Sequence, residues 1–297
     1  MKQNWIAIFG KIDLSNDQVT LIPQASHDGA PQEQPPITVA RSNVLFDGGA
    51  ITAEIFLTRP DCRCQIGFGG PQGTEVFAGL NVFAAAYGIA TLQNRKWEPV
   101  AWAGYGDKAP AEVWVDVAVH VAGSTIDLLV SGVKVCTHTT AIQKSALTLL
   151  FQGDSPVHVR NFRVRSVRPI CFVVMQFTDE FNALYKEVIK PTCEAYGYEV
   201  LRGDDFYSSG LIIEDISRSI REATLIIADI TPNNANVFYE VGFAHGIGKP
   251  TILLSDRKRD KLPFDVSGFR TLFYDNTIGG KGAIEENLRK HLASIAA

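Results

Sequence analysis

The sequence predicts two domains of different class. Residues 1–167 are expected to form an all-β antiparallel sandwich with a jelly-roll-like topology, and residues 168–297 an α/β domain with a flavodoxin-like parallel sheet. Three observations predict this division. A chain of 297 residues is long enough for two hydrophobic cores. Apolar residues alternate with polar ones in the first part and recur at helical spacing in the second. The change of period falls at residues 166–169.

Alternation is clearest at residues 113–121, where every second residue is valine, as in a half-buried strand. Glycine-containing turns then separate the expected strands 125–130 and 133–135. Further strands are expected at residues 5–12, 51–57, 64–68, 146–151 and 157–164. Residues 23–37 contain four prolines and are expected to form a long loop. No helix is predicted in this part, and many short strands with Gly and Pro turns favour a sandwich.

The second part opens with a continuous apolar run at residues 170–175, which is typical of a strand buried on both faces. Thr178 is a candidate N-cap, followed by two acidic residues that suit a first helical turn. The apolar residues of the predicted helix then recur at i, i+3, i+4, i+7 and i+8: Phe181, Leu184, Tyr185, Val188 and Ile189.

Strands are expected next at 198–201, 224–228, 251–254 and 271–274. Helices are expected around Ile212–Ile220, at 235–247 before Gly248, and along an apolar stripe at 284–295. Such alternation of strands and helices requires a parallel sheet with helices on both faces, and a five-stranded flavodoxin-like order is its simplest closure.

The bulk composition argues against two classes of partner. A net charge of -4 gives no basic footprint for nucleic acid. The N-terminal apolar run is too short for a signal peptide, and no segment reaches the roughly 20 apolar residues that span a bilayer. We therefore expect no nucleic-acid partner, no membrane contact and a cytoplasmic location.

Among the five cysteines, only Cys62 and Cys64 lie close together in the sequence. No second Cys or His pair stands near them to complete the tetrahedral ligand set of a structural zinc site. We therefore expect no metal, and we expect the cysteines to be buried free thiols.

In open α/β sheets, ligands bind beyond the carboxyl ends of the strands. Short polar and aromatic residues occur at those positions, and the candidates for substrate binding are Gln176, Phe177, Asp204, Asp205, Asn233, Asn236 and Tyr239. Alternatives remain for several of them. Asp204 and Asp205 either bind ribose hydroxyls or form a solvated loop. Asn233 and Asn234 suit a turn and a helix N-cap, and Asp229 suits a turn cap.

Asn236 and Glu240 lie four residues apart and share one helix face. The neighbours of Glu240 in the sequence are strongly apolar, so its carboxylate either faces a cleft or is costly to bury. The alternative is a solvated helix residue. A half-desolvated glutamate suits attack on an anomeric carbon, and the nearby helix N-terminus favours an anionic ligand.

Residues 172–177 (FVVMQF), 228–231 (ADIT) and 236–250 (NVFYEVGFAHGIGKP) resemble the nucleoside 2-deoxyribosyltransferase-like family, which is related in fold to TIR domains. The last motif is the most specific, and the similarity covers about residues 170–275. The resemblance implies that Glu240 is the catalytic nucleophile and that Asp229 helps to hold the base. It also implies a homo-oligomer, in which residues 273–276 complete a neighbouring site.

The segment 233–236 (NNAN) replaces the Asp-Gly-Thr-like turn of the transferases. Relatives with the NVFYE form are similar to TIR-like effectors, some of which cleave NAD. The resemblance therefore implies hydrolysis or transfer at the N-glycosidic bond of a nucleoside, nucleotide or NAD, which serves as substrate, with no cofactor. A bacterial defence or stress effector is the expected setting. The alternative is a non-catalytic module that senses a nucleotide.

The first part resembles concanavalin-A-like lectin/glucanase sandwiches through residues 114–119 (WVDVAV), 126–135 (IDLLVSGVKV) and 159–164 (VRNFRV). This resemblance implies a sensor or binding domain with a glycan or protein ligand. Trp97, Trp102 and Tyr105 are candidates for stacking on a sugar ring, and core or rim packing is the alternative for them.

Overall fold

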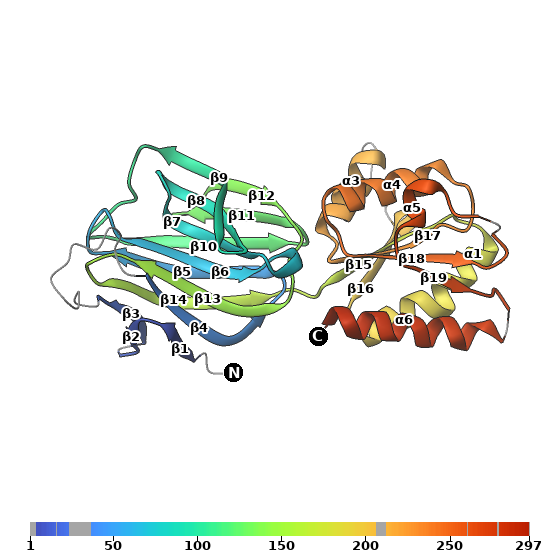
Figure 1. Cartoon of the computed structure of the whole chain (residues 1–297), viewed down its shortest axis with the longest axis horizontal. Helices are drawn as coiled ribbons and strands as arrows, with labels where there is room; N and C mark the ends of the chain where they lie inside the picture. Colours follow the sequence, from blue (N-terminus) through green and yellow to red (C-terminus); the bar gives the residue numbers. More distant parts are fainter. Residues whose placement is uncertain are drawn as a thin grey trace. The chain divides into compact units, whose positions relative to one another are not determined.

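The computed structural model describes residues 4–15, 17–23, 37–205, 212–259, 261–277 and 279–296. The chain divides into two compact units (Figure 1). One comprises Met1–Val121 with Thr125–Val167, and the other Ala122–Ser124 with Arg168–Ala297.

The first unit is an all-β sandwich of two seven-stranded antiparallel sheets, as predicted. The first sheet contains, in spatial order, β1 (Trp5–Phe9), β4 (Ile37–Phe46), β13 (Ser145–Gln152), β6 (Arg63–Gly69), β7 (Glu75–Val82), β8 (Ala85–Gln93) and β9 (Lys96–Tyr105). The second contains β12 (Val133–Thr139), β11 (Thr125–Val130), β10 (Trp114–Ala122), β5 (Gly49–Leu57), β14 (Val157–Ser166), β3 (Gln18–Ile22) and β2 (Lys11–Asp13). A short 3-10 turn, η1 (Pro71–Gly73), precedes β7.

The valines of β10 confirm the alternation prediction, because Val115, Val117, Val119 and Val121 are all buried in the core of the sandwich. The single strand predicted at residues 5–12 is two strands, β1 and β2, in different sheets, and strands β3, β4, β7, β8 and β9 were not predicted. Strand β7 shows why. Seven of its eight residues are buried, so both faces of the strand are covered and its sequence does not alternate between apolar and polar residues. The loop predicted at 23–37 ends where β4 begins, and residues 24–36 lie outside the described part.

The second unit contains a five-stranded parallel sheet, as the alternation of elements predicted. Its spatial order is β16 (Glu199–Arg202), β15 (Ile170–Val174), β17 (Leu225–Asp229), β18 (Thr251–Asp256) and β19 (Thr271–Tyr274). The helices are α1 (Asp179–Leu184), η2 (Tyr185–Ile189), α2 (Lys190–Ala195), α3 (Ile212–Glu222), α4 (Ala235–Gly246), α5 (Phe264–Ser267) and α6 (Gly280–Ala296), with a 3-10 turn η3 (Gly203–Asp205).

Strand β15 is buried on both faces, as its apolar run predicted. Cys171 and Val173 belong to one apolar cluster, whereas Phe172 and Val174 belong to another. Figure 1 shows α3 and α4 on one side of this sheet and α6 on the other. The helix expected after Thr178 begins at Asp179, but Thr178 makes no side-chain cap and a π-helical segment, η2, follows.

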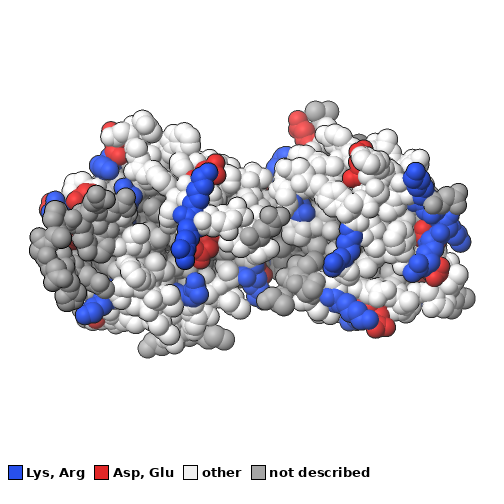
Figure 2. Space-filling view, viewed as in Figure 1, with Lys and Arg blue, Asp and Glu red and all other residues white. Residues whose placement is uncertain are grey.

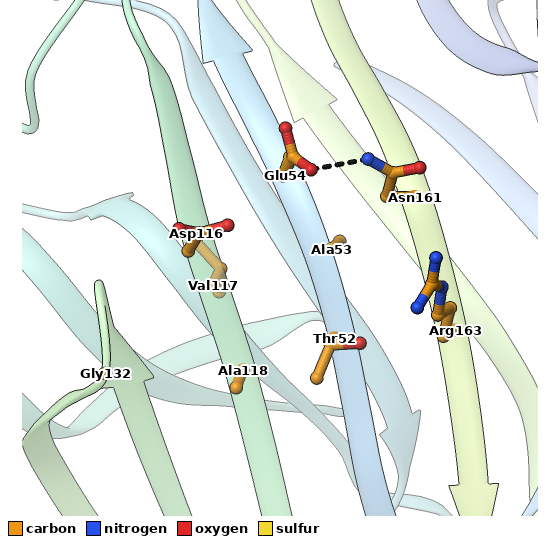
Figure 3. Close-up of a pocket in the computed structure, with 9 residues that line it drawn as sticks. All are labelled: Thr52, Ala53, Glu54, Asp116, Val117, Ala118, Gly132, Asn161 and Arg163. Atoms are coloured by element: carbon orange, nitrogen blue, oxygen red, sulfur yellow. Dashed lines mark hydrogen bonds between the residues drawn. The ribbon is translucent and has the colours of Figure 1, made fainter.

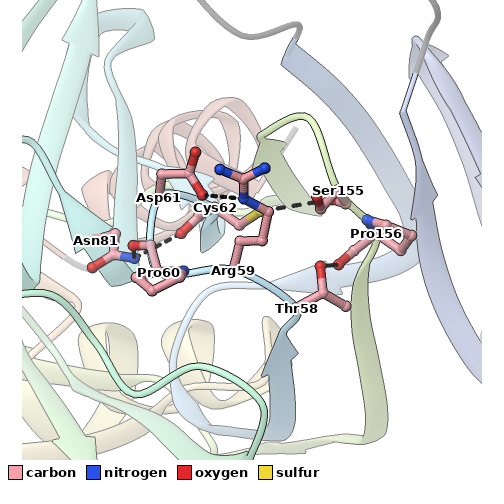
Figure 4. Close-up of polar contacts among 8 residues, drawn as sticks. All are labelled: Thr58, Arg59, Pro60, Asp61, Cys62, Asn81, Ser155 and Pro156. Carbon is pink, nitrogen blue, oxygen red and sulfur yellow. Dashed lines mark hydrogen bonds and ion pairs between the residues drawn. The ribbon is translucent and has the colours of Figure 1, made fainter.

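All five cysteines are buried free thiols, as expected. Figure 4 shows how Cys62 is held in the bend after β5. Its thiol donates to the Ser155 carbonyl at 3.7 Å, and its own carbonyl accepts from the Asn81 amide at 2.7 Å. Burial raises the pKa of the Cys62 thiol, which opposes the thiolate that a metal requires. Within the described residues, no group of three or more His, Cys, Asp and Glu side chains is placed to hold a metal ion.

None of the described helices is both long enough and apolar enough to cross a membrane.

Candidate functional site

A pocket of about 380 Å³ opens beside the carboxyl ends of β15 and β16, between α3 and α4. This is the edge at which ligands bind in open α/β sheets. Five of the predicted site residues line it: Gln176, Phe177, Asn236, Tyr239 and Glu240. Residues far apart in the sequence therefore meet in one cavity.

The first turn of α4 is held by its N-cap, as predicted. The Asn234 side-chain oxygen accepts from the backbone N–H of Asn236 at 3.0 Å and of Val237 at 3.5 Å. This cap satisfies two of the backbone donors that a helix leaves free at its start. Because Asn236 and Glu240 lie one turn apart, both side chains reach the same pocket.

Glu240 is half-buried and forms no hydrogen bond or ion pair with a described residue. Burial raises the pKa of its carboxyl from 4.5 to about 7. Much of the pocket wall is apolar, with Met175, Val237 and Ile216 among its residues. The carboxyl therefore changes its charge near neutral pH inside a largely apolar cavity.

Two aromatic side chains in the pocket wall remain open to solvent: Phe177 is 53% exposed and Tyr239 57% exposed. The Arg202 guanidinium lies 5.1 Å from the centre of the Phe177 ring and 4.3 Å from that of Tyr185. A guanidinium over an aromatic face is attracted by the ring quadrupole. Arg202 thus contacts Phe177, one of the residues that line the pocket.

Asp204 is engaged with Arg202 and is not among the lining residues. Its carboxylate accepts from the Arg202 Nε at 2.6 Å, and this contact lowers the pKa of Asp204. The side chain of Asp205 lies outside the described residues. Asn233 is exposed, and its side-chain oxygen accepts from Arg259 at 2.9 Å. The Arg259 guanidinium also donates to the Ile230 and Thr231 carbonyls, so it fastens the β17–α4 loop.

Asp229 is fully buried at the end of β17 and does not line the pocket. Its carboxylate accepts from the Tyr274 hydroxyl at 2.7 Å and from the Thr231 backbone N–H at 2.9 Å. Burial raises the pKa of Asp229 despite these two hydrogen bonds. The carboxylate caps the turn after β17 and ties it to β19, which is the turn-cap alternative. Tyr274, expected near a neighbouring subunit's site, is 4% exposed within its own unit.

The sequence did not single out Arg202 or Arg259, and it named Tyr274 only within residues 273–276, which were expected to complete a neighbouring site. Arg202 ends β16, so the rule that ligands bind at strand ends could have identified it. The roles of Arg259 and Tyr274 depend on contacts with residues 26 or more positions away, for which the sequence carries no signal.

On β9 of the sandwich, Trp97 lies against Phe77 with the ring centres 4.9 Å apart, which is the packing alternative. Trp102 is 55% exposed and Tyr105 76% exposed. On the face shown in Figure 2, Lys and Arg side chains form small separate groups among uncharged residues, and acidic side chains lie beside several of them.

No protein-family model matches this chain, and no curated protein matches it. Among solved structures, it is similar to a carbohydrate-binding module from Bacillus subtilis at 9% identity and a TM-score of 0.42, over 53% of this chain and 92% of that one. A Bacillus subtilis protein of unknown function with a galectin-like fold gives 10% identity and a TM-score of 0.42, over 54% and 87%.

A beta-1,3-1,4-glucanase derived from a mouse hindgut metagenome gives 12% identity and a TM-score of 0.39, over 52% of this chain and 88% of that one. Identities and scores this low carry no conclusion about ligand or activity.

Proposed function

We propose that the α/β unit acts on the N-glycosidic bond of a nucleoside, nucleotide or NAD, with Glu240 as nucleophile or transition-state stabiliser. One observation carries the proposal. Glu240 is a half-buried carboxyl without a hydrogen-bond partner among the described residues, and it faces a pocket with two exposed aromatic rings. A carboxylate held without a partner in an apolar wall lowers stability, so its presence favours a functional role.

The chemistry follows from charge. As the bond between the anomeric carbon and the base nitrogen breaks, the electron pair leaves with the base and positive charge develops on the sugar. The Glu240 carboxylate then stabilises this charge or forms an ester bond to the anomeric carbon. Attack by water at that carbon completes hydrolysis, and attack by a second nucleobase completes transfer. Partial removal of water strengthens this interaction. Both roles need ionised Glu240, so the rate should rise with pH through about 7.

The other lining residues have roles that suit such a substrate. Phe177 and Tyr239 offer ring faces for a nucleobase, and Gln176 and Asn236 offer amides for its edge or for ribose hydroxyls. Asp229 then acts by holding the β17 end. Asp204 and Asn233 would reach the substrate only after leaving the arginines that hold their side chains, whereas the contribution expected from Asp205 stays a prediction.

The strands of the parallel sheet lie in the spatial order β16-β15-β17-β18-β19, which is 2-1-3-4-5 when they are numbered along the sequence. This order supports a flavodoxin-like domain with its site beside β15. The resemblance of residues 170–275 to the nucleoside 2-deoxyribosyltransferase-like and TIR-like domains supports the same site. The jelly-roll-like topology of the sandwich stays a prediction.

The test is incubation of the full chain with NAD and a panel of nucleosides, read by chromatography for free base. We expect Glu240→Gln to lower base release by at least about 1,000-fold, as loss of a covalent or charge-stabilising group does. Glu214→Gln is the matched control, because Glu214 is an exposed residue of α3 outside the pocket lining. Base release by Glu240→Gln at the parent rate would refute the assignment.

A second candidate is a nucleotide-sensing module without turnover. It is favoured by the pocket lining, in which Glu240 is the single carboxylate among the described residues, whereas most glycoside hydrolases use two. Saturable nucleotide binding with no product after long incubation would support sensing. Rapid base release would exclude it.

In this proposal the sandwich is a sensor that binds a glycan or protein, and Trp102 and Tyr105 are the exposed rings available for that contact. The whole protein is then a homo-oligomeric bacterial defence or stress effector. Unchanged nucleotide and NAD pools and unchanged growth after induced expression, under every trigger tried, would contradict this setting.

A further inference from the structure

A second hollow, of about 260 Å³, lies on the outer face of the second sheet of the sandwich. Figure 3 shows its lining side chains, which come from β5, β10 and β14, together with Gly132 in the turn before β12. Its floor is formed by small residues such as Thr52 and Ala118, and its sides by charged and amide groups. Small residues beside long polar ones leave a depression on this face of the sheet.

The polar side of this hollow depends on a β-bulge in β14. Arg160 pairs with Glu54 and Arg163 pairs with Thr52, so β14 has one residue more than β5 between these two pairs. Asn161 adopts a left-handed backbone conformation with a φ of 52°. Such bulges re-aim side chains, and asparagine is one of the few non-glycine residues that adopt a left-handed conformation readily. Here the bulge brings the Asn161 and Arg163 side chains to the same hollow.

Glu54 is fully paired within this arrangement. Its carboxylate accepts from the Arg160 Nε at 2.8 Å and from the Asn161 amide at 2.5 Å. These contacts, with the Asn161 hydrogen bond as the largest cause, lower the pKa of Glu54. The Arg160 guanidinium also lies 3.9 Å from the centre of the Trp114 ring. Glu54 is therefore a fixed anion whose charge is already matched.

Asp116 and Arg163 are exposed and less engaged than Glu54, although the nearby charge of Arg163 contributes to lowering the pKa of Glu54. Neither side chain forms a hydrogen bond or ion pair with a described residue. Asp116 lies directly across from Glu54, an arrangement of like charges that is unfavourable between strands. Figure 3 shows Asp116 on one side of β5 and Arg163 on the other. Since β10 and β14 both pair with β5, their backbones lie about 9.5 Å apart.

We propose that this hollow binds a small zwitterion of the amino-acid type, with its ammonium group toward Asp116 and its carboxylate toward Arg163. One end of the hollow offers a carboxylate and the other a guanidinium, and a neutral or singly charged ligand would leave one of them unmatched. A compact molecule with both charges matches both ends. The site is separate from the pocket of Glu240 and does not depend on its chemistry.

The test is calorimetric titration of the full chain with glycine, β-alanine and γ-aminobutyrate, whose charge separation increases along the series. Ethylamine, acetate and glucose are the single-charge and neutral probes. We expect saturable binding of at least one zwitterion, at least about tenfold tighter than ethylamine, acetate or glucose. Asp116→Asn and Arg163→Gln should each weaken this binding at least about tenfold.

Arg165→Gln is the control, because Arg165 is exposed on the same strand and does not line the hollow. It should bind the zwitterion as the parent does. Three results would overturn the proposal: no saturable binding of any zwitterion, tighter binding of glucose, or unchanged binding in both Asp116→Asn and Arg163→Gln.

Discussion

Glu54 in the sandwich and Glu240 in the α/β unit are both half-buried glutamates, but their surroundings are opposite. Three hydrogen bonds from Arg160 and Asn161 lower the pKa of Glu54. Glu240 has no such partner among the described residues, and burial raises its pKa to about 7. A paired carboxylate stabilises the fold that holds it, whereas an unpaired one lowers stability. The comparison therefore separates a structural carboxylate from a functional candidate.

Asp229 is like Glu240 in that burial raises its pKa, and like Glu54 in that its carboxylate accepts hydrogen bonds. Its partners come from the turn after β17 and from β19, so it joins two strand ends of the parallel sheet. Removing a carboxylate from such a position leaves buried donors without acceptors, which is more costly than losing a surface contact.

The largest stability change is expected for Asp229→Ala. It leaves the Tyr274 hydroxyl and the Thr231 backbone N–H without their acceptor, at a cost of about 3 kcal/mol. Urea unfolding at neutral pH, followed through the transition of the α/β unit, measures the loss. Asp229→Asn retains one oxygen acceptor and should lose clearly less. Equal stability of Asp229→Ala and the parent would show that the buried network does not hold the strand ends.

The next change has the opposite sign and depends on pH. The carboxyl of Glu240 has a pKa of 4.5 when unfolded and about 7 when folded, so the parent loses stability as pH rises from about 4.5 to about 7. Glu240→Gln removes this loss and should be more stable than the parent at pH 8, by about 1–3 kcal/mol after allowance for partial solvent exposure.

The gain of Glu240→Gln should disappear toward pH 4, where the parent carboxyl is neutral in both states. Urea unfolding at pH 4, 6 and 8 gives the comparison, and the exposed Glu214→Gln should show no such trend. A destabilised Glu240→Gln at pH 8 would mean that the carboxylate has a partner in solution.

The smallest change is expected for Glu54→Gln. The folded pKa of Glu54 lies below 4.5, so its stabilising contribution is present above that value and is lost as pH falls through the folded pKa. The variant should melt below the parent at pH 7 and together with it at strongly acid pH. Thermal melting of the sandwich transition measures this difference, with the exposed Glu98→Gln as the control. A constant difference at all pH values would indicate lost packing instead of lost charge pairing.

Some of the candidate site was accessible from the sequence and some was not. The spacing of Asn236 and Glu240 and the cap at Asn234 are local features of one helix, and the pocket contains both residues. Asp204 and Asn233 follow strands as the rule for open sheets requires, yet arginines hold both side chains. The position of a residue at a strand end predicts that it lies at the edge of the sheet. The partner that binds its side chain depends on tertiary packing.

The sequence by itself determined the class of each unit, because strand and helix periods are set by neighbouring residues: the valines of β10 predicted a sandwich strand, and the run of β15 a doubly buried one. Only the tertiary structure decided the state of each carboxylate. Glu54 meets Arg160 from 106 positions away and Asp229 meets Tyr274 from 45 positions away, whereas Glu240 meets no partner among the described residues. Charge, pKa and pairing depend on distance in space and on burial, and neither is encoded in local periodicity.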